Sequence, residues 1–163
     1  MKPRPSLLVV AGVVVLSAVV AVPALTTAQA PTATTITVQE KVQTVVQDDV
    51  APKSRRGRAS VGDRLITRQS LFDAHRRRIG TLYTDCTSVG PTRPFPRLTV
   101  LCTVTYKLAD GQIVAVGATR FDDENGELPI IGGTGADAGA RGTLRFAKPM
   151  RGYDTAVVIT LGG

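Results

Sequence analysis

Two cysteines and one histidine set narrow limits on the chemistry of this 163-residue chain. Two thiols are too few for a four-thiolate zinc site, and a single His75 excludes a metal centre built from several histidines. We therefore expect no metal and no other cofactor.

Glu40 is the first candidate for a catalytic group. It lies between Val38 and Val42 in a stretch with a period of two, which places it on the apolar face of a strand. Burial there would raise the pKa of its carboxyl group, which could then polarise or protonate a bound intermediate. The alternative is a position at the mouth of the fold, where Glu40 is solvated or salt-bridged.

A glycine-rich segment, Gly132-Gly133-Thr134-Gly135, precedes Arg141. Such a segment can cradle a phosphate when a helix follows it, but no helical pattern follows here. We expect these glycines to permit a sharp bend or bulge instead.

The elements that would position these residues are strands. From Ile36 onward apolar residues recur with a period of two, and Gly, Pro and Asp separate the runs, which is typical of an all-β domain. In 97–108 the apolar face is Leu98, Val100, Cys102, Val104, Tyr106 and Leu108. Asp110-Gly111 predicts a tight hairpin into a strand at 113–121. Further strands are expected at 36–46, 64–72, 79–86, 128–131, 141–147 and 153–161.

About eight strands with one apolar face each favour a closed antiparallel barrel, since closure removes exposed edges. A sandwich is the alternative. Residues 31–163 would form this single domain, with a mobile connection at 47–62. On the first strand we expect Ile36, Val38, Val42 and Val46 to share one face.

The two cysteines are expected to pair. If 79–86 and 97–108 form a hairpin about Pro94, Cys86 faces Cys102. In an oxidising compartment two facing cysteines form a disulfide. The alternative keeps Cys86 as a free reactive thiol.

Residues 1–30 have the features of a secretory signal peptide. Lys2 and Arg4 precede an apolar run at 7–25, and Ala28-Gln29-Ala30 follows. We therefore expect a secreted, extracellular protein. Alternatively, the apolar run is retained as a membrane anchor.

The chain is basic, with a net charge of +7, and its cations gather at 53–58 and 75–78. These clusters would give weak contact with an anionic envelope surface, or they are merely solvated loops. Because only 4% of the residues are aromatic, with none between the basic residues, we expect no nucleic-acid partner.

The segment 128–135, with Ala140-Arg141-Gly142 after it, resembles the signature of plant dirigent proteins and the corresponding segment of plant allene oxide cyclases. Gly62-Asp63, Leu71-Phe72, Ile79-Gly80 and Cys86 are similar to the cyclases in the same order. The resemblance extends over about residues 36–161.

The resemblance implies an eight-stranded antiparallel barrel that assembles as a homo-oligomer, a trimer, around elongated apolar cavities. Its members hold an unsaturated lipid epoxide during cyclisation, an isomerase reaction, or phenoxy-derived intermediates during stereoselective coupling. It thus implies a small hydrophobic ligand and catalysis largely by shape, through orientation and exclusion of water.

The resemblance also assigns roles to single residues. Glu40 matches a Glu that steers the cyclase reaction, while Val42 replaces a polar Asn. Gln69, on the same face as Leu65, falls where the cyclases use an Asn to orient an epoxide oxygen. Alternatively, the opposite face of this strand points inward, and Gln69 then faces solvent.

Cys86 matches a buried cyclase cysteine, and Arg141 matches a dirigent Arg that contributes to the cavity. The dirigent Asp after the glycines is replaced by Ala136, so lignan-type activity is not expected.

Another class of function is a non-catalytic extracellular carrier or structural β-domain. Tyr83, Tyr106, Phe121 or Phe146 would then fill the interior.

Overall fold

The computed structural model describes residues 33–50, 58–91, 93–94 and 97–162, and the expected signal peptide lies outside these ranges. The strands are β1 (Thr34–Asp48), β2 (Arg58–Ala59), β3 (Arg64–Phe72), β4 (Arg78–Ser88), β5 (Arg93–Pro94), β6 (Thr99–Leu108), β7 (Gly111–Arg120), β8 (Glu127–Gly135), β9 (Arg141–Ala147) and β10 (Thr155–Gly162). Within the described ranges no helix is long and apolar enough to cross a membrane.

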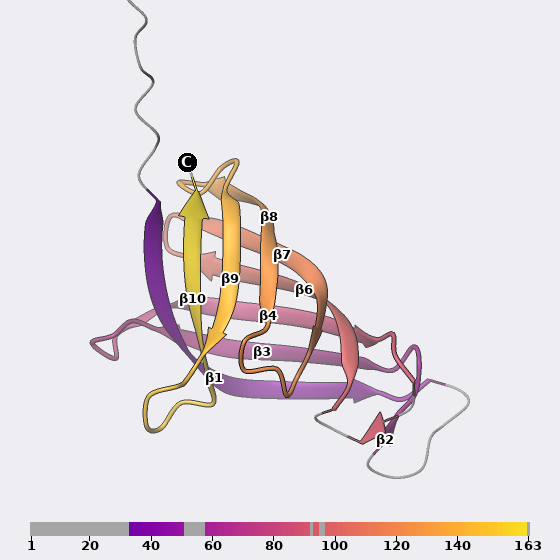
Figure 1. The fold of residues 1–163 in the computed structure, drawn as a ribbon. Helices are drawn as coiled ribbons and strands as arrows, with labels where there is room; N and C mark the ends of the chain where they lie inside the picture. The colour runs from indigo at the N-terminus through magenta and orange to yellow at the C-terminus, as the bar shows by residue number, and fades with distance from the viewer. Residues whose placement is uncertain (1–32, 51–57, 92, 95–96, 163) are drawn as a thin grey trace, which may run out of the picture.

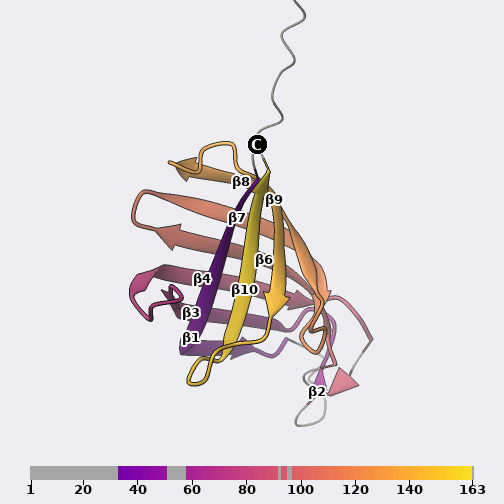
Figure 2. The ribbon, with the colours of Figure 1, turned by 60° about the vertical axis from the view of Figure 1, so that its left-hand side comes forward.

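Eight of these strands close into an antiparallel barrel in the order β1-β10-β9-β8-β7-β6-β4-β3, and β3 pairs with β1 again. Figures 1 and 2 show β1, β10 and β9 side by side, with β3, β4, β6 and β7 on another side. The short strands β2 and β5 form a separate pair at one end of the barrel. The predicted eight-stranded barrel is therefore confirmed, and the sandwich is not.

The strand β1 pairs with two neighbouring strands along different parts of its length. Its first half, from Thr34 to Glu40, pairs with β10, and Gln39 to Asp48 pair with β3. A bulge between Val42 and Thr44 leaves Gln43 outside the regular register. As a result Val46 faces Ile66 on the outer surface. The prediction that Val46 shares a face with Val42 was wrong, because the strand is not regular.

The core lies inside the barrel and uses one face of every strand. The face predicted for 98–106 is buried, with Tyr106 only 1% exposed. The largest fully buried side chains are Tyr106, Leu71, Leu82, Ile113, Leu128, Leu144, Ile159, Val38, Val100, Val157 and Cys86. Each large apolar side chain contributes roughly 1.5–3 kcal/mol by leaving water.

The hairpin between β4 and β6 has the predicted register, with Cys86 opposite Cys102 and Leu82 opposite Tyr106. Cys86 and Cys102 form a disulfide across 16 residues of sequence. The free-thiol alternative is therefore wrong. A loop of this length makes the disulfide worth about 3 kcal/mol in the chain-entropy model.

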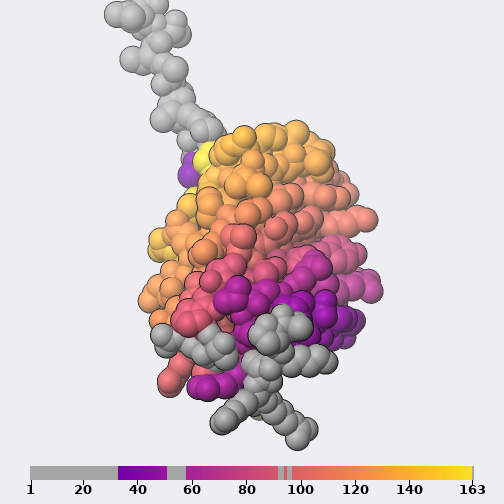
Figure 3. All heavy atoms as spheres, turned by 90° about the vertical axis from the view of Figure 1, so that its right-hand side faces the viewer, coloured from indigo at the N-terminus to yellow at the C-terminus, as the bar shows by residue number. Residues whose placement is uncertain are grey.

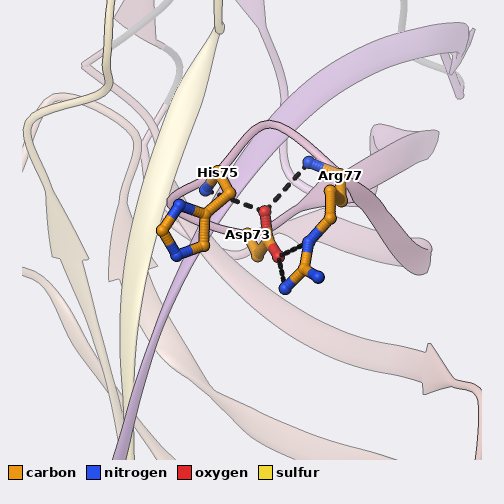
Figure 4. A network of polar contacts seen from close by, with 3 residues as sticks. All are labelled: Asp73, His75 and Arg77. Carbon is orange, nitrogen blue, oxygen red and sulfur yellow. Dashed lines mark hydrogen bonds and ion pairs between the residues drawn. The ribbon is translucent and has the colours of Figure 1, made fainter.

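The hairpin between β3 and β4 holds the second basic cluster. Asp73 accepts hydrogen bonds from the backbone amides of His75 and Arg77, and its carboxylate forms an ion pair with the Arg77 side chain (Figure 4). The bond from the Arg77 amide is the main reason why the pKa of Asp73 is lowered. Arg76 has a positive φ of 62° at the tip of this turn. The cluster is thus an exposed turn organised by one carboxylate.

Two segments of the expected connection at 47–62 are strand. Residues 47–48 end β1, and Arg58–Ala59 form β2. Residues 51–57 lie outside the described ranges, and the mobility of the connection stays a prediction.

Candidate ligand-binding site

A cavity of about 160 Å³ lies at the end of the barrel where β3 begins and β4 ends. Figure 3 looks onto this end of the molecule, where magenta and pink segments lie side by side. The cavity is lined by Gln47, Ala59, Asp63, Arg64, Leu65, Cys86, Ser88, Leu98, Val100 and Phe121. A protein cavity of roughly 150 Å³ holds a benzene molecule. The space therefore accommodates about one six-membered ring.

One row of inward residues at this end of the barrel is made of small side chains. Ser88, Val100 and Thr119 lie opposite one another across β4, β6 and β7. Six residues away along β4, the corresponding row is Leu82, Tyr106 and Ile113, whose side chains fill the interior. One half of the barrel is therefore packed by its own side chains, while the other half leaves a space.

Ser88 is a lining residue of this cavity whose side-chain hydroxyl is buried and, among the described residues, unpaired. Its side chain is only 3% exposed, and its hydroxyl has no hydrogen-bond partner within the described residues. Its backbone is fully used: the amide donates to the Asp63 carbonyl, and the carbonyl accepts from the Gly62 amide. The backbone of Ser88 is thus held in place by two hydrogen bonds, and the hydroxyl oxygen is buried within the wall.

Asp63 is also buried at the cavity, but its carboxylate is satisfied. It accepts hydrogen bonds from the Ser60 amide at 2.7 Å, the Ser60 hydroxyl at 3.1 Å and the Val50 amide at 3.0 Å. Burial acts to raise the pKa of Asp63, yet these bonds together outweigh it and lower the pKa. Asp63 therefore organises the rim of the cavity rather than offering a free charge.

Arg64, the cationic residue in the lining, is paired as well. Its guanidinium forms an ion pair with Asp85 on the outer surface of the barrel. No group of three or more His, Cys, Asp or Glu side chains that could hold a metal occurs in the described part of the chain. The wall is mainly apolar, and its two charged residues, Asp63 and Arg64, are both paired.

Glu40 lies where β1 changes partner from β10 to β3. Its side chain is 3% exposed, so it is buried as the parity predicts and is not solvated at a mouth. The Tyr106 hydroxyl donates to its Oε1 at 2.8 Å, and the Thr155 hydroxyl donates to its Oε2. Burial raises the pKa of Glu40, and these two hydrogen bonds only partly oppose the effect.

Gln69 faces the interior between Val42 on β1 and Leu82 on β4. Its amide nitrogen contacts the Thr67 hydroxyl at 3.3 Å, while its Oε1 has no partner in the described ranges. The alternative in which Gln69 points to solvent is wrong. Neither Gln69 nor Glu40 belongs to the lining of the cavity.

The inner face of β1 connects the cavity with the region around Glu40 and Gln69. Beyond Glu40, β1 pairs with β3 but not with β10, so its inner face is partly uncovered. Val42 and Val45 face inward opposite Gln69 and Thr67 and are 37% and 55% exposed. Gln47, the next inward residue, lines the cavity. An apolar strip of roughly 20 Å, at about 3.3 Å per residue, thus leads from the cavity toward Glu40.

The glycine-rich segment lies away from the cavity. Gly132, Gly133, Thr134 and Gly135 end β8, and Gly135 pairs with Gly111 at the start of β7, whose other end leads to the cavity residue Phe121. Thr134 is exposed opposite Gln112.

These glycines and Arg141 shape the hairpin from β8 to β9. A Cβ on Gly133 would come within 2.2 Å of the Asp137 carbonyl oxygen, and Gly135 has a positive φ of 63°. Arg141 donates to the carbonyl oxygens of Ile131 at 2.7 Å and Ala140 at 2.9 Å. The segment therefore permits a tight turn, as expected for a bend.

Sequence reasoning missed several residues of the site. Ser88 follows Cys86 by two positions on the same face, so the period of two could have indicated it. The contacts of Glu40 with Tyr106 and Thr155 span 66 and 115 residues, and no local pattern signals them.

Residues 33–159 match the model of the allene oxide cyclase barrel like domain. The chain is similar in structure to a pyocyanin demethylase, with a TM-score of 0.65 and 23% identity, covering 78% of this chain and 99% of the other. A pterocarpan synthase dirigent protein has a TM-score of 0.56 and 16% identity, covering 80% of this chain and 92% of the other. A Diels-Alderase from Streptomyces koyangensis has a TM-score of 0.54 and 15% identity, covering 83% of this chain and 70% of the other.

At these identities the three structures show a shared fold. No match was found among the curated proteins. The family model spans most of the described barrel, including Glu40, Gln69 and the disulfide. The chain belongs to the allene oxide cyclase barrel like domain family.

Proposed function

We propose that this barrel binds a small, largely apolar molecule in the cavity beside Cys86 and guides its cyclisation or coupling. The observation that carries the proposal is the cavity inside a closed barrel, with a wall made mainly of apolar side chains. Such enclosed apolar spaces with few polar groups are typical of ligand sites. The structural neighbours include a dirigent protein and a Diels-Alderase, which supports this class of reaction.

Shape would supply most of the rate enhancement. A ring of the ligand fills the cavity, and the rest of the molecule follows Val45 and Val42 along the inner face of β1. Holding a flexible molecule in one folded conformation lowers the entropic part of the barrier, and burial of the ring in the cavity removes water from it. A cyclisation of this kind is an isomerisation and consumes no co-reactant. In a coupling, the two molecules would arrive already activated.

Glu40 and Gln69 would act at the far end of this strip. Burial favours the protonated form of Glu40, so its carboxyl group can lend a proton to a developing oxyanion and take it back when the product forms. Thr155 is exposed and bonded to Glu40, which gives the buried group a contact with solvent. The amide of Gln69 would orient an oxygen of the ligand.

We also propose that residues 1–30 direct secretion and that the domain works outside the cell as a homo-oligomer, a trimer. The disulfide supports an oxidising compartment, because cytosolic thiols are kept reduced. An anchor formed by residues 7–25 would place the same domain at the outer surface of a membrane.

A carrier or structural role without catalysis is the second candidate. It is favoured by Tyr106, whose ring is fully buried and fills the interior beside Glu40. In this case a ligand would be held but left unchanged.

The proposal can be tested by filling the cavity. Val100→Phe places a larger side chain in the cavity, whereas Leu101→Phe on the same strand adds a ring to the exposed outer face. Native mass spectrometry after mild extraction should detect a bound hydrophobic molecule with wild type and Leu101→Phe and should lose it with Val100→Phe. Equal retention by all three folded proteins would overturn the cavity as the binding site.

Catalysis is tested separately with Glu40→Gln. The variant should convert a reactive polyene or epoxide substrate more slowly while binding it equally well. Unchanged turnover would remove Glu40 from the mechanism, whereas binding without turnover by wild type would favour the carrier.

A further inference from the structure

Glu40, the acid of the proposed reaction, is too deeply buried to contact a ligand directly. The residue is 3% exposed, and each of its carboxyl oxygens is engaged: Oε1 by the Tyr106 hydroxyl and Oε2 by the Thr155 hydroxyl. Of these two partners, Tyr106 is only 1% exposed, whereas Thr155 is exposed. Within the described residues, the hydrogen-bonded route from Glu40 to the surface therefore leads through Thr155.

Thr155 lines a groove of about 310 Å³. The groove is formed by the loop between β7 and β8, the end of β9 and the start of β10, which lie at one end of the barrel (Figure 1). Phe121, Phe146 and Pro149 give it an apolar wall. Phe121 also lines the cavity beside Cys86, so the two spaces adjoin at this residue.

We propose that Thr155 is a catalytic residue that relays a proton between Glu40 and an oxygen of a ligand held in this groove. The inference rests on the proposed function, to which it adds the group that contacts the reacting oxygen. A hydroxyl accepts one hydrogen bond while it donates another, which is what a relay requires. The groove would therefore take a neutral oxygen, such as that of an epoxide or a carbonyl group.

The relay moves protons and consumes none. Burial raises the pKa of Glu40 and so favours its protonated form. The carboxyl proton passes from Oε2 to Thr155 Oγ1, while Thr155 gives its own hydroxyl proton to the ligand oxygen. When the product forms, the ligand oxygen returns a proton to Thr155, and Thr155 returns one to Glu40. Tyr106 remains bonded to Oε1 and stabilises the carboxylate in between.

The backbone holds Thr155 against Glu40. The two residues are direct partners in the register of β1 and β10. The Asp154 amide donates to the Glu40 carbonyl at 3.0 Å, and Asp154 Oδ2 accepts from the Val42 amide at 2.8 Å. These two bonds fix the start of β10 to β1, so the relay geometry is preorganised.

The carboxylates of the groove are the alternative source of a proton. They are Asp122, Asp123, Glu124 and Asp154. The hydrogen bond from Arg120 lowers the pKa of Asp122, which keeps that group ionised. Variants of Thr155 leave all four carboxylates in place, so such variants distinguish these groups from the relay.

The first measurement follows the buried hydroxyl proton of Tyr106 and needs no ligand. Its exchange with solvent is measured by NMR on the processed, disulfide-bonded protein with isotope-labelled tyrosine. The proteins are wild type, Thr155→Val, Thr155→Ser and, as the control on the outer face of β10, Thr160→Val. We expect Thr155→Val to slow exchange about tenfold or more, because exchange then requires local opening of the strands. Thr155→Ser and Thr160→Val should exchange like wild type, and equal or faster exchange in Thr155→Val would overturn the proposal.

The second measurement uses styrene oxide, which carries a ring and an epoxide oxygen and isomerises to phenylacetaldehyde. A proton lent to the oxygen allows the benzylic carbon–oxygen bond to break, a hydride shifts to the benzylic carbon, and the oxygen gives the proton back. Wild type, Thr155→Ser and Thr160→Val should accelerate this reaction over buffer, whereas Thr155→Val and Glu40→Gln should not. The wild-type acceleration should fall as pH rises through the raised pKa of Glu40. Acceleration by Thr155→Val equal to that of wild type would overturn the relay.

The outcomes also separate the two proposals. If Val100→Phe loses a bound molecule but wild type does not accelerate the isomerisation, the cavity remains a binding site and Thr155 is not a catalytic residue. If wild type, Leu101→Phe and Val100→Phe retain a molecule equally, the cavity beside Cys86 is wrong, while the two Thr155 measurements still decide the relay.

Discussion

The hydroxyl of Tyr106 on β6 donates a 2.8 Å hydrogen bond to the carboxyl group of Glu40 on β1, across the inside of the barrel. This contact joins two strands that are not neighbours in the sheet. It also gives a buried acid a fixed partner, so the same pair contributes to both stability and the proposed chemistry.

Tyr106→Phe should destabilise the fold. The change removes one of the two donors to Glu40 and leaves a buried carboxyl group partly unsatisfied. We expect a loss of about 1–3 kcal/mol in the free energy of unfolding. Tyr83→Phe on the exposed surface is the control and should stay within about 0.5 kcal/mol. Equal effects of the two changes in urea titrations would contradict the role of this bond.

Glu40→Gln should change how stability depends on pH. The pKa of Glu40 is raised in the folded state above its ordinary value of 4.5. Between 4.5 and the folded value, the folded protein holds more protons than the unfolded chain, so wild-type stability falls as pH rises through this window. The variant lacks this contribution.

Unfolding free energies of both proteins should be measured from below pH 4.5 to neutral pH. The stability of wild type relative to Glu40→Gln should decrease over this range. A constant difference would show that the carboxyl group titrates as it does in the unfolded chain.

Reduction of the Cys86–Cys102 disulfide should cost about 3 kcal/mol, because it releases a loop that spans 16 residues of sequence. Denaturant titrations with and without a thiol reductant measure the loss. The double variant Cys86→Ala and Cys102→Ala is the control and should not respond to the reductant. A wild-type curve that is equally insensitive after complete reduction would rule out this contribution.

The glycines of β8 should differ sharply in their tolerance of a side chain. Gly133→Ala would bring its Cβ within 2.2 Å of one backbone oxygen and 2.5 Å of another, so the strands must move apart. We expect a cost of about 3 kcal/mol or more. The nearest atom to a Cβ on Gly132 is 3.8 Å away, so Gly132→Ala should change stability by less than about 1 kcal/mol. Thermal unfolding of both variants measures the two losses in stability. Similar losses would contradict the close packing at Gly133.

The strands and the cysteine pairing could be predicted because their signals are local. The period of two identifies the strands, and the turn between 86 and 97 is short enough for facing residues to be counted from it. The burial of Glu40 follows from the same parity. The roles of Glu40 and Gln69 in catalysis stay predictions.

The cavity could not be predicted from any single strand. It depends on the side chains that β3, β4 and β6 together turn inward, and on Phe121 and Leu98, which lie just outside the strands and complete the lining. The bulge in β1 has no glycine or proline to signal it, which is why the orientation of Val46 was missed.

Gln43 is the supernumerary residue of β1. Since Val42 already pairs with Gln69 and Thr44 with the adjacent Arg68, a chain without Gln43 would keep every later side chain pointing the same way. Loss of Thr44 would have the same result, because Gln43 would then lie opposite Arg68, and Val45 and Gln47 would still face inward. The inner face of β1 therefore tolerates a one-residue deletion at this bulge, and variation in strand length among related chains should concentrate there.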